Sequence, residues 1–507
     1  MSDTRHSRGA AAARARPALV EAPLAALLAA LLAAVLASCV GTPAYQAPNV
    51  SVARTYGAAG GATTPPAAPG DRDTASARSA HYSAEPASSP FWRDLGDTTL
   101  TRLVEEALRA NTDVRVVEER LSGTRASRRL AALDLVPTVT GIGSATRQQI
   151  ASAQFPGLPG GLPAQNLWDV GFDASWELDI FGRIGRNVGA RSALVESAEH
   201  SLEDVRVSLA AEVARTYFDL RGAQRQLDVA RRNAENQRRT LALTEDRLTA
   251  GRGTAFDTER ARAVLNLTLA ATPALESAIS ADRHRLAVLV GRAPGASPDP
   301  VPGAGDLPRL PDTVHVGSPE QLVRRRPDVL GAERQLAAQT LFTGAARAEY
   351  LPRLTLGANV GYTATSLDSL GQKGTTRLLI GPTLTWPLLD LGRVRERVDV
   401  AEAQRQEARA QYSSTVLRAL EETETALVSY DRAHARLAVL GEAVRASAHA
   451  AELAQQRFEA GLTDLLQVLD AERTLLDAEN QLAETHTAAA TALVAVYKSV
   501  GGTWPIR

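Results

Sequence analysis

The chain has few of the residues that usually carry redox chemistry or metal binding. It contains one cysteine and one methionine in 507 residues, and aromatic residues make up 4%. A single cysteine excludes an internal disulfide. The eight histidines show no metal-ligand spacing, and no nucleophile elbow, phosphate loop or dinucleotide fingerprint occurs. A net charge of -1 gives no reason to expect nucleic-acid binding. We therefore expect no enzyme and no metal or other cofactor.

Proline is missing from two long stretches, residues 186–272 and 388–504. Each stretch carries apolar residues at strict seven-residue spacing, which indicates long coiled-coil helices. The first helix, from about 185 to 250, would be roughly 100 Å long. We expect Gly251, Gly253 and Gly461 to supply positive φ angles that end each helix and reverse the chain. A return helix then gives helical hairpins at about 185–291 and 392–501.

The chain repeats itself at a fixed offset of about 210 residues. WELDIFGR at 176–183 is echoed by WPLLDLGR at 386–393, and RLTAG at 247–251 by RFEAG at 457–461. Unrelated helices would not keep this register, so the sequence predicts two tandem structural repeats. We place them at 91–300 and 301–507.

Four segments alternate apolar and polar residues with a period of two, which is typical of strands with two different faces. They lie at about 138–146, 168–178, 354–362 and 378–388, within strand hairpins at about 137–180 and 352–389. Each is long enough for a tilted strand to cross a bilayer. Interface aromatics stand near the ends of the segments: Trp168, Trp176, Tyr362 and Trp386. A soluble sandwich explains the alternation equally well.

Four strands cannot close a barrel, for which about eight are needed. A sheet with open edges cannot lie in hydrocarbon, because its unpaired backbone groups are too costly there. If the strands lie in lipid, several chains must share one barrel. Eight strands would give a dimer and twelve a trimer, and the strand count does not choose between them.

The pattern of the N-terminal residues is typical of a targeting segment. A basic region holding Arg5 and Arg16 precedes an apolar run at 24–36 that is too short to span a bilayer. The run ends in LASC at 36–39, which resembles the bacterial lipobox. We predict a lipoprotein signal peptide at 1–38, a covalent lipid (with palmitate) on Cys39, and a lipid-anchored flexible tether at 39–90 that is rich in Ala, Pro and Ser. The alternative is an ordinary signal peptide that contains a cysteine.

Four motifs together resemble one known family. They are WELDIFGRI at 176–184, LVRRRPDV at 322–329, LPRLT at 351–355 and GLTDLLQVLDAE at 461–472. They are similar to the TolC-like outer membrane factors of bacterial efflux systems, in the lipoprotein NodT/OprM branch. The resemblance covers about residues 90–505.

The resemblance implies a mainly α fold with β structure, assembled as a homotrimer. Each repeat would supply a transmembrane β-hairpin and a long coiled-coil helical hairpin. Three chains would form a twelve-stranded β-barrel that continues into a periplasmic α-helical barrel. The implied location is the bacterial outer membrane, in contact with its lipid. The implied partners are a periplasmic membrane-fusion (adaptor) protein and an inner-membrane pump of the RND, MFS or ABC type.

The resemblance also points to residues at the hairpin tips. Asp470 matches a pore aspartate of the family, and Asp257 matches a position that links the closed gate. Three positions depart from the family pattern: Gln467 replaces a second acidic residue, Phe458 an aromatic with a hydroxyl, and Thr463 a linking arginine. Because of these departures, the sequence does not predict which hydrogen bonds hold the gate closed.

The function expected is a passive exit duct that conducts small molecules from adaptor and pump to the exterior. One alternative is the outer membrane duct of a type I protein secretion system, which would have the same fold. Another is a lipid-tethered periplasmic coiled-coil scaffold that forms no pore.

Overall fold

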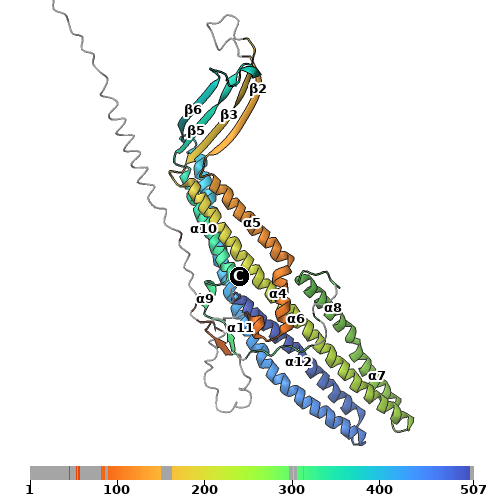
Figure 1. The fold of residues 1–507 in the computed structure, drawn as a ribbon. Coiled ribbons are helices and arrows are strands. Elements are labelled where there is room, and N and C mark those ends of the chain that lie inside the picture. Colours follow the sequence, from red (N-terminus) through yellow and green to blue (C-terminus); the bar gives the residue numbers. More distant parts are fainter. Residues whose placement is uncertain are drawn as a thin grey trace, which may run out of the picture.

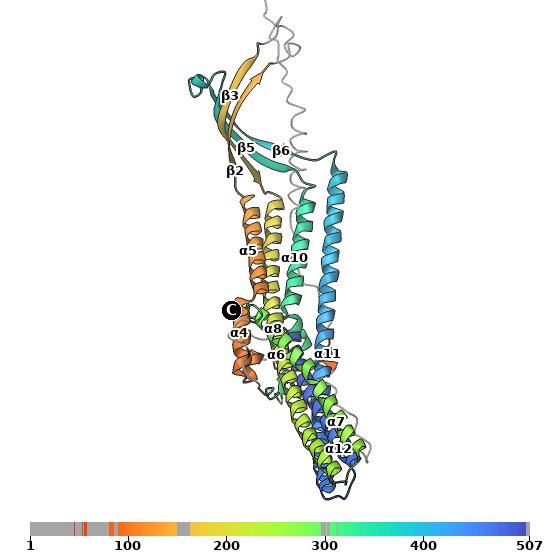
Figure 2. The ribbon, with the colours of Figure 1, turned by 90° about the vertical axis from the view of Figure 1, so that its right-hand side faces the viewer.

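The computed structural model describes residues 45, 53, 55–57, 81–85, 90–149, 163–295, 301, 305–311 and 313–502. The expected signal peptide and Cys39 lie outside these residues. The described chain is elongated, with a sheet at one end and long helices running away from it (Figure 1). Turned by 90°, the molecule shows the helices continuing directly from the base of the sheet (Figure 2).

Two very long helices form the body of the molecule. Helix α6 spans Arg183–Thr249 with 67 residues, and α11 spans Leu391–Glu459 with 69 residues. At 1.5 Å per residue each is about 100 Å long. The chain returns from α11 in one helix, α12 (Leu465–Ser499).

The return leg after α6 is divided into two helices, α7 (Ala255–Ala270) and α8 (Thr272–Leu289). The expectation of one return helix is therefore wrong for the first hairpin. The interruption falls at Ala271, just before Pro273 in the first turn of α8. Proline has no N–H to donate, so it fits at a helix start and breaks a helix interior.

Shorter helices pack around the middle and upper parts of α6 and α11. They are α3 (Phe91–Asp94), α4 (Thr98–Ala110), α5 (Thr112–Leu133), α9 (Pro319–Val323) and α10 (Pro327–Ala348). Side-chain caps begin three of them: Asp97 caps α4, Asn111 caps α5, and Ser318 forms a capping box with Gln321 at α9. A 3-10 turn, η2, covers Leu367–Ser369.

The main sheet has four antiparallel strands in the order β2-β3-β5-β6. They span Thr138–Gln148, Gln165–Leu178, Arg353–Ala364 and Thr376–Thr385. Pairing of β3 with β5 joins the two strand hairpins, so β2 and β6 are the edges of the sheet. A separate parallel pair, β1 (His81–Ser83) with β4 (Thr313–His315), was not anticipated.

The core lies midway along the rod, where α4 packs on α6 and α6 meets α12. Tyr217, Phe218, Leu427 and Tyr430 are almost fully buried there, and Phe91 stacks on Tyr497 with ring centroids 5.1 Å apart. Toward the tips the buried face of α6 changes character. Four of its buried residues there are polar, Asn233, Gln237, Thr240 and Thr244. At the tip itself, Leu241 and Leu243 pack against a small apolar cluster that includes Phe458 and Val468.

No helix in the described part of the chain is both long enough and apolar enough to cross a membrane.

Candidate functional site

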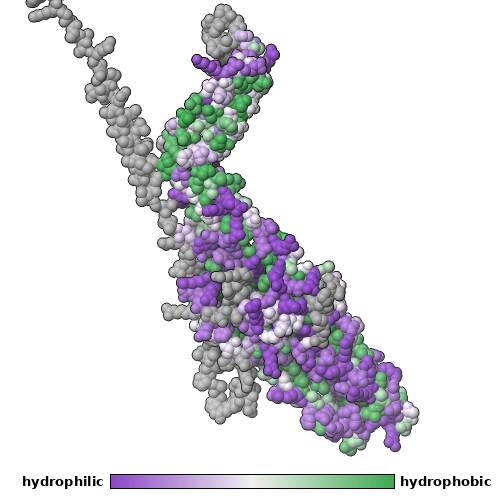
Figure 3. Space-filling view, in the orientation of Figure 1, coloured by the Kyte–Doolittle hydropathy of each residue, from purple (hydrophilic) through white to green (hydrophobic). Residues whose placement is uncertain are grey.

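One face of the main sheet is apolar and exposed. The side chains of Phe172 and Ile380 are 60% and 64% exposed, and Val170, Val360 and Leu378 are similarly open. The pairing of Phe172 with Val360, and of Val360 with Leu378, puts these residues on one face. A band of apolar surface covers part of the sheet in the space-filling view (Figure 3). A continuous apolar face of this kind marks a surface that contacts lipid or protein.

The four expected interface aromatics lie at two levels of this sheet. Trp168 and Tyr362 stand toward the end of the sheet far from the helices, since Trp168 pairs with Ala364 at the end of β5. Trp176 and Trp386 stand at the helix end. From Trp168 to Trp176 is about 26 Å along a strand, close to the height of the apolar band of outer-membrane barrels.

Trp176 and Trp386 also hold the sheet to the helices below it. The Trp176 indole donates a hydrogen bond to the carbonyl of Leu135, just after α5, at 2.9 Å. The Trp386 indole donates in the same way to Tyr350, just after α10, at 3.0 Å. An indole with one polar atom suits such a boundary between apolar and wet surroundings.

The opposite face of the sheet carries a polar network. Asp169 accepts two hydrogen bonds from Arg377, at 2.6 and 2.8 Å, and a third from Thr363 at 3.0 Å. Four residues further along β3, on the same face, Asn359 donates to Asp173. The sheet therefore has one face suited to lipid and one suited to water, the arrangement of a barrel with a polar interior.

The turns at the two hairpin tips have the same backbone geometry. Gly251 and Gly461 adopt left-handed φ angles of 72° and 76°, as expected. In each tip the backbone N–H of the third residue past the helix donates back to the carbonyl of an arginine in the last turn: Arg252 to Arg247 and Leu462 to Arg457, both at 2.8 Å. This is the Schellman pattern that ends a helix.

The expectation for Gly253 was wrong, because glycines with positive φ include Gly251 and not Gly253. A Cβ at Gly253 would lie 3.1 Å from the backbone nitrogen of Leu248, so close packing is the constraint on this residue. Thr463 holds the corresponding place in the other tip.

Asp257 and Gln467 both lie in the first turn of the helix that follows their own tip, where each takes part in the N-terminal cap. Asp257 closes a capping box with Thr254, whose hydroxyl donates to its carboxylate at 2.6 Å. Gln467 donates its backbone N–H to Asp464, the N-cap of α12, at 3.2 Å, and its side chain contacts the Thr463 hydroxyl. Asp464 was not among the residues expected at the tip, although an aspartate three residues before Gln467 is an N-cap signal.

Asp470 is exposed on α12, two turns from the tip. Among the described residues its carboxylate has no hydrogen bond or ion pair, and only its carbonyl is used, by Thr474. Phe458 is buried instead, 5% exposed, and joins the two hairpins. The guanidinium of Arg247 lies 3.9 Å from the centre of the Phe458 ring and donates to the Phe458 carbonyl.

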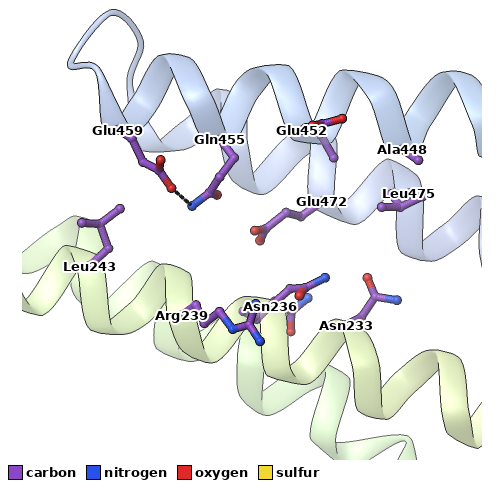
Figure 4. A pocket seen from close by; sticks show the side chains of 12 residues that line it. Asn233, Asn236, Arg239, Leu243, Ala448, Glu452, Gln455, Glu459, Glu472 and Leu475 are labelled. Atoms are coloured by element: carbon purple, nitrogen blue, oxygen red, sulfur yellow. Dashed lines mark hydrogen bonds between the residues drawn. The ribbon is translucent and has the colours of Figure 1, made fainter.

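A polar cleft of about 550 Å³ lies between the hairpins just above their tips (Figure 4). Its walls come from α6, α11 and α12, and Glu472 points into it from α12. The Thr240 hydroxyl donates to Glu472 at 2.8 Å, and Asn233 donates to Glu479 at 2.7 Å. Burial raises the pKa of Glu472, and the Thr240 hydrogen bond opposes this only in part. The antiparallel helices α6 and α12 thus contact each other through two polar pairs, which are seven residues apart along each helix.

Arg326 is a further charged residue that the structure buries. It binds Asp328 at 2.6 Å and Glu422 at 2.8 Å, and donates to the carbonyl of Ser499. It ties the start of α10 to α11 and to the end of α12, whereas its neighbours Arg324 and Arg325 are exposed. Within the described residues, no group of His, Cys, Asp and Glu is arranged to hold a metal ion.

Comparison with known proteins agrees with this geometry. The chain matches the model of the outer membrane efflux protein family over residues 103–292 and 318–502. It is 30% identical to the outer membrane protein OprJ of Pseudomonas aeruginosa over 472 residues, 91% of this chain and 96% of that protein. It is 29% identical to SrpC, a solvent efflux pump outer membrane protein of Pseudomonas putida, over 83% of this chain and 88% of SrpC. The solved structure of the outer-membrane channel OprN matches with a TM-score of 0.83 and 37% identity, covering 92% of this chain and 99% of that one.

Fold and sheet together are those of a TolC-like outer membrane channel. The chain belongs to the outer membrane efflux protein family. The resemblance drawn from its motifs, the outer membrane location and the role in efflux are confirmed.

Proposed function

We propose that this chain is the exit duct of a tripartite efflux system and conducts small molecules passively across the outer membrane. The observation that carries the proposal is the two-faced sheet. Its exposed face is apolar between two levels of aromatic residues, and its other face holds the network around Asp169 and Arg377. A pore through lipid needs both faces, because lipid must contact one and water the other.

The open edges of the sheet support a trimeric barrel. Strands β2 and β6 each have one neighbour within the chain, and hydrocarbon cannot solvate unpaired backbone groups. We propose that β6 of one copy pairs with β2 of the next, so that three copies close a barrel of twelve strands. The two repeats would then alternate around the axis, and the six helical hairpins would continue the wall as a helical tunnel.

The hairpin tips would form the periplasmic entrance. Asp470 is exposed there, and three copies of one carboxylate at a narrow opening would repel each other and favour cations. Asp257 stabilises the first tip through its capping box, and Gln467 binds the Asp464 cap of the second tip; both positions would also take part in closing the entrance. We further propose a lipid anchor on Cys39.

The proposed partners are an adaptor in the periplasm and an inner-membrane pump, which would supply the energy. SrpC is named as part of a solvent efflux pump, which supports this assignment. The duct itself needs no reaction and no cofactor in this proposal, and selectivity would lie in the pump.

Single-channel recording in planar bilayers tests the pore. We expect discrete conductance steps from the purified protein, and altered cation selectivity after Asp470→Asn. Absence of conductance in both the native protein and the Asp470→Asn variant would favour the non-pore scaffold. Loss of a secreted protein on deletion of the gene, without a change in susceptibility to toxic small molecules, would favour the type I secretion duct.

A further inference from the structure

The two hairpins of one chain are joined at their tips by Arg247. Its guanidinium, at the end of α6, donates to the Phe458 carbonyl in the last turn of α11 and lies over the Phe458 ring. The C-terminal end of a helix carries unsatisfied carbonyls and a partial negative charge, which a cation there stabilises. Arg247 therefore caps a helix that is not its own.

The second tip carries the same donor at the matching position. Arg457 stands 210 residues after Arg247, as Phe458 stands 210 residues after Leu248. The backbone hydrogen bonds around both arginines match: Gly251 donates to Leu248 at 3.0 Å, and Gly461 donates to Phe458 at 2.9 Å. Both tips therefore present an arginine and an acceptor carbonyl in the same geometry.

Only one of these two donor–acceptor sets is used within the chain. Arg457 is exposed, and its side chain makes no hydrogen bond, ion pair or ring contact with the described residues. Leu248 is 38% exposed, while its counterpart Phe458 is buried. Like the Phe458 carbonyl, the Leu248 carbonyl accepts from the backbone of its own turn, but among the described residues no side chain donates to it. Arg457 lies on the second hairpin and this carbonyl on the first, so a single chain cannot bring them into the relation that Arg247 and Phe458 have.

We propose that Arg457 of one copy caps α6 of the neighbouring copy by donating to its Leu248 carbonyl. This inference rests on the proposed trimer, in which the second hairpin of each copy lies beside the first hairpin of the next. Three contacts within chains and three between chains then close a ring of six tips. The partner is a second copy of this chain, and the ring is incomplete without it.

The two kinds of contact differ in strength for a definite reason. Arg247 has a carbonyl acceptor and an aromatic ring, whereas Arg457 would have a carbonyl and the aliphatic Leu248. A cation over an aromatic ring gains roughly 0.5–1 kcal/mol at exposed sites. The contact between chains is therefore the weaker one, and the ring opens between copies rather than between the two hairpins of one copy.

Cross-linking tests the geometry. The variant Arg457→Cys with Leu248→Cys, treated with a short bismaleimide, should give covalent dimers and trimers on a denaturing gel. The matched reference, Arg247→Cys with Phe458→Cys, should cross-link within the chain and keep the size of a monomer. The unsubstituted protein measures any background from Cys39.

The assembly is measured separately by native mass determination of the same samples. A trimer in which the reference pair reacts and the 457–248 pair does not would overturn the inference and leave the proposed function intact. A protein that is not a trimer would overturn the proposed trimer together with this contact.

Channel recording tests the difference in strength. Leu248→Phe supplies the missing ring, so we expect the open probability to fall about two- to fivefold. Arg457→Ala should raise it, and Arg252→Ala, which removes a neighbouring exposed arginine of the first tip, is the control. Equal effects of Arg457→Ala and Arg252→Ala would contradict the proposed contact.

Discussion

Arg377 on β6 binds Asp169 on β3 across the strand that separates them. The two guanidinium nitrogens lie 2.6 and 2.8 Å from the two carboxylate oxygens. The register partner of Arg377 on the intervening strand β5 is Gly361, which has no side chain to obstruct the crossing. The pair links the second strand hairpin to the first on the polar face, in addition to the backbone ladder between β3 and β5.

This relationship predicts that Arg377→Met destabilises the sheet. The carboxylate of Asp169 is 15% exposed and would lose its cationic partner. Leaving a largely buried charge unpaired costs about 1–2 kcal/mol at a site that water can still reach. The measurement is the temperature at which the detergent-solubilised protein loses β structure by circular dichroism. Arg393→Met is the control, because the Arg393–Asp390 pair is much more exposed; an equal loss in both variants would argue against the cross-strand role.

Two glycines within helices should change the stability of the protein in opposite directions when they are replaced by alanine. A Cβ at Gly222 would come within 2.0 Å of the Thr487 hydroxyl, whereas nothing lies within 4 Å of a Cβ at Gly441 in α11. Gly222→Ala should therefore destabilise the protein by about 1–3 kcal/mol through overpacking. Gly441→Ala should stabilise it by roughly 0.5–1 kcal/mol, because alanine favours a helix. Thermal unfolding followed at a helical wavelength measures both, and a stabilising Gly222→Ala would contradict the packing.

Stability should depend on pH through the carboxylates that face each other at the junction of α6 and α8. Burial, with the nearby charge of Asp219, raises the pKa of Asp282 from 3.8 to about 6. A carboxyl whose pKa is higher in the folded state stabilises the fold when protonated, and that contribution is lost as pH rises through about 4 to 6. The melting temperature of the native protein should fall over this range.

Asp282→Asn should remove much of this dependence. At pH 7.5 the variant should be more stable than the native protein by about 1 kcal/mol, after allowance for solvent screening. At pH 4 the two should melt together. Asp228→Asn, a substitution on the exposed surface of α6, is the control. A difference between native and Asp282→Asn that stays constant from pH 4 to 8 would contradict the prediction.

Substitutions at Trp176 and Trp386 can separate the effect of the aromatic ring on stability from the effect of the indole hydrogen bond. Trp176→Phe keeps an aromatic ring at the interface and removes the bond to Leu135. We expect a loss of about 1 kcal/mol, with the protein still inserted in outer membranes. Trp176→Ala removes both and should lose considerably more. Membrane fractionation and thermal unfolding measure the two effects, and the same substitutions at Trp386 are the matched pair. Equal effects of phenylalanine and alanine would assign the whole role to the hydrogen bond.

Much of the architecture could be read from local patterns. A strand with two different faces needs apolar residues at every second position, and β3 and β5 show this pattern clearly. Strand β2 is rich in small residues, so it was predicted mainly from its place before the first loop. The capping box of Ser318 and Gln321 is a local pattern of four residues that signals a helix start, and it is present at α9. The break before Pro273 also has a local cause, because proline cannot donate within a helix, although one continuous return helix was expected there.

The functional residues at the tips were harder to predict because their roles depend on neighbours distant in sequence. Arg247 and Phe458 belong to different hairpins and meet only when α6 and α11 end side by side. Leu241 and Leu248 both fall on the seven-residue apolar spacing of α6, yet Leu241 packs against the apolar cluster at the tip while Leu248 is 38% exposed. Between them and the core, α6 buries polar residues such as Gln237 and Thr240. Periodicity indicates which residues share a face; it does not say what that face meets.

The sequence alone determined the lengths of the two longest helices, the two faces of the strands, the glycine turns at Gly251 and Gly461 and, through four motifs, the family. These features depend on interactions between residues that are close in the sequence, so a short stretch of residues is enough to predict each of them. Only the tertiary structure decided that Arg377 crosses β5 to Asp169, that Glu472 is buried against Thr240, and that Arg247 is engaged while Arg457 is not. Those contacts join segments more than 200 residues apart, and their geometry exists only after the long helices have packed.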